Sequence, residues 1–330
     1  QQSEPAWIYW RAKALMQKAK TDNQKAAEPN QLKATELFKS IAGPTGFYEQ
    51  LALEELGQSI VTPPVAPLTS SDLQSAQNNM GLRRAVKAIQ MGLRSDGVRE
   101  WNYTTNLHER GGMNDSQLRS AAQMACDLQL WDRCINTSDK TRHEIDLNQR
   151  YPMPYKRDVL QAAADVGLDP AYMYGLMRQE SRFIVAAKSN VGASGLMQVM
   201  PATASWTAKK LGIPYTPDMI TDRITNLRIG AGYLKLVLDD LGGVQAMAAA
   251  AYNAGPSRPR RWREGAKVDA AAWAENIPFN ETRDYVKKVL GNAVVYAHLI
   301  DGVPMSVRKR LGQTIGPRAL TAPPAQADLP

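Results

Sequence analysis

Apolar residues recur at helical spacing along almost the whole chain, and runs that alternate apolar and polar residues are nearly absent. Leu82, Val86, Ile89 and Leu93 fall on one helical face, for example. Glycine and proline interrupt the pattern at 43–46, 62–67, 97 and 111–112. This spacing predicts a mainly α fold, with helices joined by tight turns.

The helical pattern divides at a proline-rich stretch, 151–154. Residues 1–150 are predicted to form an α-superhelical array of helix pairs, a scaffold without a reactive cluster. Residues 151–305 form a second helical domain, which holds the chemistry described below. Residues 306–330 are rich in proline and alanine, and we expect them to lie loosely on the surface.

Charge narrows the choice of partners. Forty Lys and Arg residues face 32 Asp and Glu residues, and from Tyr151 onward 22 basic residues face 15 acidic ones. This half is therefore predicted to meet an anionic partner, either nucleic acid or an acidic cell wall. No helix-turn-helix or RNA-binding signature occurs, so we expect no nucleic acid. No run of about 18 apolar residues occurs either, so we expect no membrane-spanning helix.

Metal-ligating residues are too sparse to predict a metal site or another cofactor. Cys126 and Cys134 are the two cysteines, and the three histidines are scattered. The cysteines could form a disulfide if the chain is exported, or remain as two free thiols.

The first candidate for chemistry is Glu180. Asp169 and Pro170 are a good N-cap and first residue for a helix that runs to Glu180. Met173 and Met177 place Glu180 on the apolar face, near the negative end of the helix dipole. The apolar face and the helix dipole both favour the protonated form of this carboxyl, which could act as a general acid. The alternative is a solvated Glu paired with a neighbouring arginine.

The next segment, 189–201, contains a glycine turn at Gly192 and Gly195, followed by a helix that starts at Pro201. Its Ser194 lacks the spacing of a serine-hydrolase elbow, and no histidine lies nearby. No Gly-Lys-Ser/Thr follows, so it is not a phosphate loop.

Two later segments carry polar groups at helix ends. Tyr252 and Asn253 end an alanine-rich helix that Gly255 and the following proline stop, and a helix cap alone would explain this pattern. Glu281 follows a predicted N-cap, Asn280, in the first turn of another helix. There the dipole favours an ionised carboxylate, the opposite environment from that of the predicted general acid.

Taken together, four motifs in order resemble the catalytic domain of soluble lytic transglycosylases, which have a lysozyme-like fold and cleave peptidoglycan. The motifs are Glu180-Ser181, the turn at 195–198, Ala251-Tyr252-Asn253 and the run 281–286. The resemblance covers about 151–301. The first half resembles the end of the family's superhelical scaffold and its linker, and most of the family's long superhelix is absent from this chain. The loop after Asn253 departs from the family, because Ser257 replaces a common glycine and four arginines follow, at 258, 260, 261 and 263.

The resemblance implies a role for each motif residue. Glu180 would be the single catalytic acid/base, and the residues expected to bind or orient the sugar are Ser181, Ser189, Gln198, Met200, Tyr252, Asn253, Glu281 and Tyr285. The implied reaction cleaves the bond between N-acetylmuramic acid (MurNAc) and N-acetylglucosamine (GlcNAc). It forms 1,6-anhydro ends with help from the substrate's own acetamido group, a known exception to the scheme with two carboxylates. A hydrolytic muramidase and an inactive peptidoglycan-binding scaffold are the alternatives.

The resemblance also implies a location. The chain would act as a monomer on glycan strands in the periplasm, after removal of a signal peptide that this sequence lacks, and its partner enzymes are unknown. In that oxidising compartment a disulfide between Cys126 and Cys134 becomes the favoured state.

Overall fold

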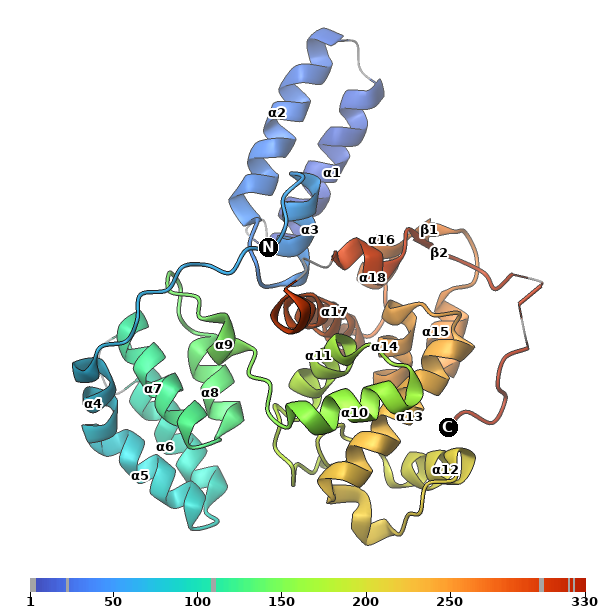
Figure 1. The fold of residues 1–330 in the computed structure, drawn as a ribbon. Coiled ribbons are helices and arrows are strands. Elements are labelled where there is room, and N and C mark those ends of the chain that lie inside the picture. Colours follow the sequence, from blue (N-terminus) through green and yellow to red (C-terminus); the bar gives the residue numbers. More distant parts are fainter. Residues whose placement is uncertain (1–3, 22–23, 108–110, 303–305, 320, 323) are drawn as a thin grey trace. The chain divides into compact units, whose positions relative to one another are not determined.

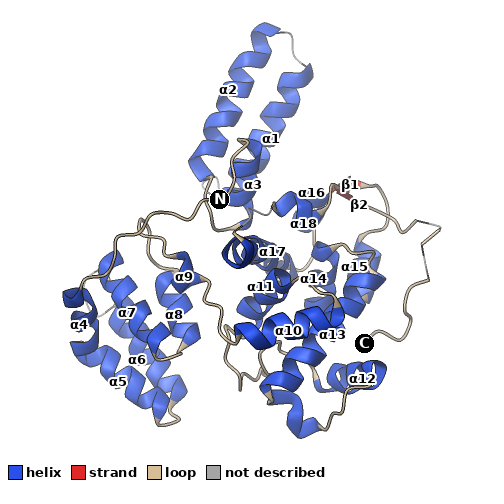
Figure 2. Ribbon diagram, viewed as in Figure 1, coloured by secondary structure: helices blue, strands red, loops and turns tan. Residues whose placement is uncertain are grey.

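The computed structural model describes residues 4–21, 24–107, 111–302, 306–319, 321–322 and 324–330. These residues form eighteen α-helices, one 3-10 helix and two strands of two residues each (Figures 1 and 2). The predicted mainly α fold is confirmed. No helix in the described part of the chain is both long and apolar enough to cross a membrane.

The chain forms two compact units, each described by itself. The larger unit contains Gln1–Val61, Tyr155–Ser181 and Val185–Pro330, and the smaller unit contains Thr62–Pro154 and Arg182–Ile184. The predicted boundary at 150 therefore lies close to a change of unit. The segment Gln1–Val61, however, belongs to the same unit as the second half of the chain, and the rest of the predicted scaffold belongs to the other unit.

The smaller unit is an array of short helices that pack on their neighbours in the chain. Its helices are α4 (Ser70–Asn78), α5 (Met80–Gln90), α6 (Arg94–Asn106), α7 (Asp115–Asp127), α8 (Trp131–Ser138) and α9 (Leu147–Arg150). Trp101 is fully buried in the core between them, and its indole N–H donates to the Thr137 hydroxyl at 2.8 Å. Cys126 and Cys134 form a disulfide that joins α7 to α8.

Removing this disulfide is expected to destabilise the smaller unit. Closing the short loop between the two cysteines restricts the unfolded chain, which stabilises the fold by about 2–3 kcal/mol. The double variant Cys126→Ala/Cys134→Ala should therefore unfold at lower urea concentration, and dithiothreitol should shift the unmodified chain in the same way. An unfolding midpoint that neither change moves would contradict this expectation.

The larger unit begins with three helices, α1 (Pro5–Thr21), α2 (Gln24–Ile41) and α3 (Phe47–Glu55), of which α1 and α2 form a hairpin (Figure 1). Helix α3 joins them to the end of the chain, because the Glu54 carboxylate accepts from the Ser306 hydroxyl at 2.9 Å and from the Val307 backbone N–H at 2.6 Å. These contacts explain why the N-terminal helices belong to this unit.

The rest of the larger unit is a helical bundle. It comprises α10 (Lys156–Val166), α11 (Pro170–Glu180), α12 (Pro201–Leu211), the 3-10 helix η1 (Pro217–Thr221), α13 (Arg223–Asp240), α14 (Gln245–Ala254), α15 (Ser257–Trp262), β1 (Val268–Asp269), α16 (Ala270–Glu275), α17 (Asn280–Asp301), α18 (Val307–Leu311) and β2 (Thr314–Ile315). Helix α17 packs along both α11 and α14. The side chains of α14 are mostly alanines with no exposed surface, so its neighbours approach closely.

A glycine sets the distance between α11 and α17. A Cβ atom at Gly175 would lie 2.7 Å from the Val289 carbonyl oxygen and 2.9 Å from the Ala293 backbone nitrogen. Beside it in the chain, Tyr174 stacks its ring on that of Tyr296 at 5.0 Å. Only glycine allows the two backbones to lie this close. The end of α11 and the first turns of α17 therefore lie near each other.

The C-terminal segment is more ordered than the sequence suggests. Val307, Leu311 and Ile315 are buried, and β2 pairs antiparallel with β1. The expectation of a loosely held tail is therefore wrong for 306–316, because spaced apolar side chains give this segment a surface to bury. Further along, the Tyr233 hydroxyl donates to the Pro330 carbonyl at 2.9 Å.

Candidate active site

Glu180 is the last residue of α11. The Asp169 side chain accepts from the Ala171 backbone N–H at 2.9 Å and Pro170 is the first helical residue, so the predicted start of this helix is confirmed. Every residue from Ala171 to Arg178 is buried, so the helix lies inside the bundle and presents only its end. The Glu180 carboxyl is therefore held in place by a rigid element.

The surroundings of Glu180 favour its protonated form. Loss of hydration raises the pKa of Glu180 to about 7, the negative charge of Glu281 acts in the same direction, and a hydrogen bond from Tyr285 opposes both. The predicted shift towards the neutral acid is thus present, with burial as its main cause. A carboxyl with a pKa near 7 can both donate and accept a proton at neutral pH.

Helix α17 contributes two groups beside Glu180. The Tyr285 hydroxyl donates to Glu180 Oε1 at 2.5 Å, and burial together with the Glu180 charge raises the pKa of Tyr285 well above its usual range. Glu281 lies one turn earlier on α17 and is exposed. The predicted cap by Asn280 is wrong: Asn280 is itself the first helical residue, and the Phe279 position makes no side-chain cap.

The end of α14 also lies near Glu180. Its predicted stop at Gly255 is confirmed. The Tyr252 hydroxyl donates to the Met197 carbonyl at 2.8 Å, and burial and the Glu180 charge raise the pKa of Tyr252. Asn253 Oδ1 accepts from the Thr282 hydroxyl at 2.7 Å, which fixes the end of α14 against the start of α17.

The glycine turn is held by a residue that the sequence analysis missed, Asn226 on α13. Its amide donates to the Ser194 carbonyl at 3.0 Å and to the Ile220 carbonyl at 2.7 Å, and its oxygen accepts from the Met197 backbone N–H at 2.8 Å. Gly195 has a φ of 80°, and a Cβ atom there would lie 2.2 Å from the Asn226 amide. Polar residues, Thr225 and Arg228, lie on both sides of Asn226 in the chain, so the local sequence carries no signal for this role.

Three other predicted residues form hydrogen bonds that hold the turn. The Ser181 hydroxyl donates to the Leu196 carbonyl at 2.7 Å and so joins the end of α11 to the turn. Gln198 has a φ of 46°, and its amide donates to the carbonyls of Ala187 at 3.1 Å and Gly195 at 2.8 Å. The Ser189 hydroxyl accepts from the Ala193 backbone N–H at 2.9 Å.

Met200 immediately precedes α12, and its side chain is 41% exposed. Within the described part of the chain, neither Ser189 nor Met200 forms a hydrogen bond with Glu180. Their predicted roles towards a sugar therefore depend on how substrate lies along this surface.

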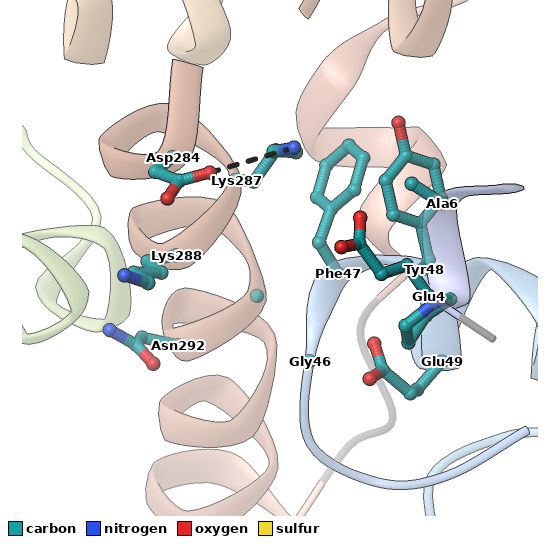
Figure 3. A pocket seen from close by; sticks show the side chains of 12 residues that line it. Glu4, Ala6, Gly46, Phe47, Tyr48, Glu49, Asp284, Lys287, Lys288 and Asn292 are labelled. Atoms are coloured by element: carbon teal, nitrogen blue, oxygen red, sulfur yellow. Dashed lines mark ion pairs between the residues drawn. The ribbon is translucent and has the colours of Figure 1, made fainter. Parts of the chain in front are cut away.

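A pocket of about 380 Å³ lies elsewhere in the larger unit and contains none of the predicted site residues. Figure 3 shows Phe47, Tyr48 and Glu49 of α3 on one side of it and Lys287, Lys288 and Asn292 of α17 on the other. The Tyr285 hydrogen bond and the Glu281 charge both act on Glu180, so the candidate active site is there and not in this pocket.

The sequence and the fold both match a known class. Residues 158–273 match the profile of the transglycosylase SLT domain, and residues 276–304 match that of the soluble lytic transglycosylase helical domain. The second match coincides largely with α17, which lies in the domain predicted to be catalytic and not in the predicted scaffold.

Related proteins extend this match along the chain. Soluble lytic murein transglycosylases of Escherichia coli and Salmonella typhimurium are each 30% identical to it, over 90% and 89% of this chain and 44% of their own length. The chain therefore spans about half the length of these relatives. These matches confirm the resemblance to soluble lytic murein transglycosylases that was inferred from the motifs.

Solved structures of lytic transglycosylases are similar to this chain along most of its length. An inactive mutant of the lytic transglycosylase Slt from Pseudomonas aeruginosa, in which one Glu is replaced by Gln, has a TM-score of 0.80 and 31% identity, over 95% of this chain and 49% of that one. The 70 kDa soluble lytic transglycosylase of Escherichia coli has a TM-score of 0.75 and 28% identity, over 94% and 49%.

Proposed function

We propose that this chain cleaves the β-1,4 bond between MurNAc and GlcNAc in peptidoglycan without consuming water and leaves 1,6-anhydro-MurNAc ends. The observation that carries the proposal is the Glu180 carboxyl at the end of a buried helix, with a pKa of about 7 and a hydrogen bond from Tyr285. Similarity to soluble lytic murein transglycosylases supports it, as does the inactivity of a Glu-to-Gln mutant of the similar Pseudomonas protein.

In the proposed mechanism Glu180 acts twice. Its carboxyl first protonates the bridging oxygen, and the bond from that oxygen to C1 of MurNAc breaks. The 2-acetamido oxygen of the same sugar stabilises the positive charge that develops at C1. The Glu180 carboxylate then removes the proton from the C6 hydroxyl, whose oxygen bonds to C1. The proton balance closes on Glu180, so neither water nor a cofactor is needed.

Substrate assistance suits this arrangement of carboxylates. A retaining glycosidase of the usual kind needs a nucleophilic carboxylate about 5–5.5 Å from the acid. Glu281 is exposed and raises the pKa of Glu180 through its charge. In the proposal it keeps the acid protonated and leaves the nucleophilic role to the substrate. Tyr252, Asn253, Ser181, Ser189, Gln198 and Met200 would line the sugar site.

The product distinguishes this proposal from its nearest alternative, a hydrolytic muramidase. Digestion of purified sacculi followed by mass spectrometry should yield muropeptides lighter by one water than those with reducing ends. A digest that contains only reducing ends would show that the chain is a hydrolytic muramidase and not a transglycosylase. If purified glycan strands are not cleaved at all, the result favours the inactive peptidoglycan-binding scaffold.

The partners and location follow from the proposed substrate. We propose that the chain acts as a monomer on glycan strands in the periplasm, where murein lies. The basic excess of the second half fits strands that carry carboxylates.

The pH dependence gives a test of the electrostatics. Because Glu180 must start protonated, kcat/KM should fall as pH rises through the pKa of about 7. Tyr285→Phe removes a hydrogen bond that lowers this pKa, so the falling limb should move to higher pH. Glu281→Gln removes a charge that raises it, so the limb should move to lower pH. Shifts in the same direction would contradict the assignment.

A further inference from the structure

The loop after Asn253 carries four arginines, and the structure divides them into two kinds. Arg260 pairs with Asp240 at 2.7 Å and donates to the Gln326 carbonyl at 2.8 Å, and Arg263 donates to the Gly316 carbonyl at 2.8 Å, so both hold the C-terminal segment. Arg258 and Arg261 are exposed. No carboxylate of the described residues lies within ion-pair distance of either one.

Arg258 is fixed in position although it lies at the surface. Its guanidinium lies 4.9 Å from the ring centre of Phe279, and Nη1 donates to the Ala254 carbonyl at 2.6 Å. The Phe279 ring is 45% exposed and rests edge-on against Trp262 at 5.5 Å. Stacking on a ring that is itself supported reduces the mobility of the guanidinium and leaves further N–H groups free to bind.

This platform of Arg258 on Phe279 adjoins the candidate active site. Ala254 directly follows Asn253, whose side chain bonds to Thr282. Phe279 is two residues before Glu281, whose charge acts on Glu180. Arg258 on α15 is hydrogen-bonded to the last residue of α14, and Phe279 immediately precedes α17. The end of α14 and the start of α17 carry Asn253, Glu281 and Tyr285.

We propose that Arg258, stacked on Phe279, binds a carboxylate carried by the substrate strand and so selects acidic murein over neutral glycans. A preorganised guanidinium fork without an internal acidic partner is suited to a carboxylate, which it can bind through two parallel hydrogen bonds. The carboxylate belongs either to a stem peptide or to the lactyl group of MurNAc. This inference rests on the proposed function.

Binding to the Glu180→Gln variant tests the proposal without turnover. Three ligands of equal length are compared by calorimetry: strands with stem peptides, strands stripped of peptides that keep lactyl carboxylates, and neutral chito-oligosaccharide. Adding Arg258→Gln should weaken binding of a carboxylate-bearing ligand about tenfold and leave chito-oligosaccharide unchanged. Adding Arg261→Gln, the matched control, should change none of the three. Arg258→Lys keeps the positive charge but not the two parallel N–H donors of the guanidinium. Its affinity for a carboxylate-bearing ligand should fall, but by less than that of Arg258→Gln.

Each outcome decides a separate point. A loss confined to strands with peptides assigns the carboxylate to the stem. A loss confined to stripped strands assigns it to the lactyl group, whose carboxyl is free only once the peptide has been removed. A loss with both acidic strands shows that Arg258 binds either carboxylate. An equal loss with all three ligands, or no loss, would overturn the proposal for Arg258 and leave the proposed function intact. A chain that binds none of the three before Arg258 is changed would overturn the proposed function, and this inference with it.

Discussion

Replacing Glu180 by glutamine should leave the chain folded and lower the rate of strand cleavage by about 10³-fold or more. Glutamine has nearly the same shape and can still accept the hydrogen bond from Tyr285, but it can neither give a proton to the bridging oxygen nor take one from the C6 hydroxyl. The rate is measured as release of soluble muropeptides from sacculi.

Glu264→Gln is the matched control, because Glu264 is an exposed carboxylate in the same unit. It should keep the full rate. A folded Glu180→Gln variant with the parental rate would refute the catalytic assignment.

Glu180→Gln should also stabilise the larger unit at high pH. The pKa of Glu180 is about 7 in the fold and about 4.5 in the unfolded chain, so the fold retains a proton that the unfolded chain releases between these values. The fold therefore loses stability as pH rises through this window, by on the order of 3 kcal/mol. Below about pH 4 the two proteins should be equally stable. Above about pH 7.5 Glu180→Gln should unfold at higher urea concentration than its parent.

Gly175→Ala should reduce both stability and activity. The new methyl group would meet backbone atoms of α17 at 2.7 and 2.9 Å, and backbone cannot turn aside as a flexible side chain can. Alanine favours a helix by about 1 kcal/mol over glycine, but overpacking against rigid backbone costs about 3 kcal/mol, the upper end of the usual range, so we expect a net loss of about 2 kcal/mol.

The activity should fall because α11 ends in Glu180 and α17 carries Tyr285. Separating the two helices by a fraction of an ångström lengthens the 2.5 Å hydrogen bond between these residues, and misplacement of about 1 Å can cost about 10²-fold. Gly291→Ala on α17 is the control, since its methyl group would find its nearest neighbour at 3.4 Å. If Gly175→Ala behaves like this control, the close approach of the helices does not position the site.

Much of the site could be predicted from the sequence because its residues occur in local motifs. Asp169 and Pro170 start α11, and the apolar residues that follow fix which face Glu180 occupies. The alanines and the glycine of α14 place Tyr252 and Asn253 at its end. Each of these depends on helix propensity and on neighbours close by in the chain.

Other features depend on contacts between distant segments, which no local pattern encodes. Asn226 on α13 holds a turn that precedes α12, and Phe279 beside α17 supports Arg258 on α15. The segment Gln1–Val61 belongs to the larger unit through the contacts of Glu54 with 306–307.

The sequence by itself determined the helical fold, the order of the motifs and the candidate for the acid, because helical spacing and residue chemistry are local properties. The tertiary structure alone decided how the motifs meet. Glu180 and Tyr285 are far apart in the chain, and their hydrogen bond exists because Gly175 lets α11 and α17 pack with their backbones in contact. The pKa of Glu180 likewise depends on burial by segments far along the chain, which the sequence can suggest in direction only.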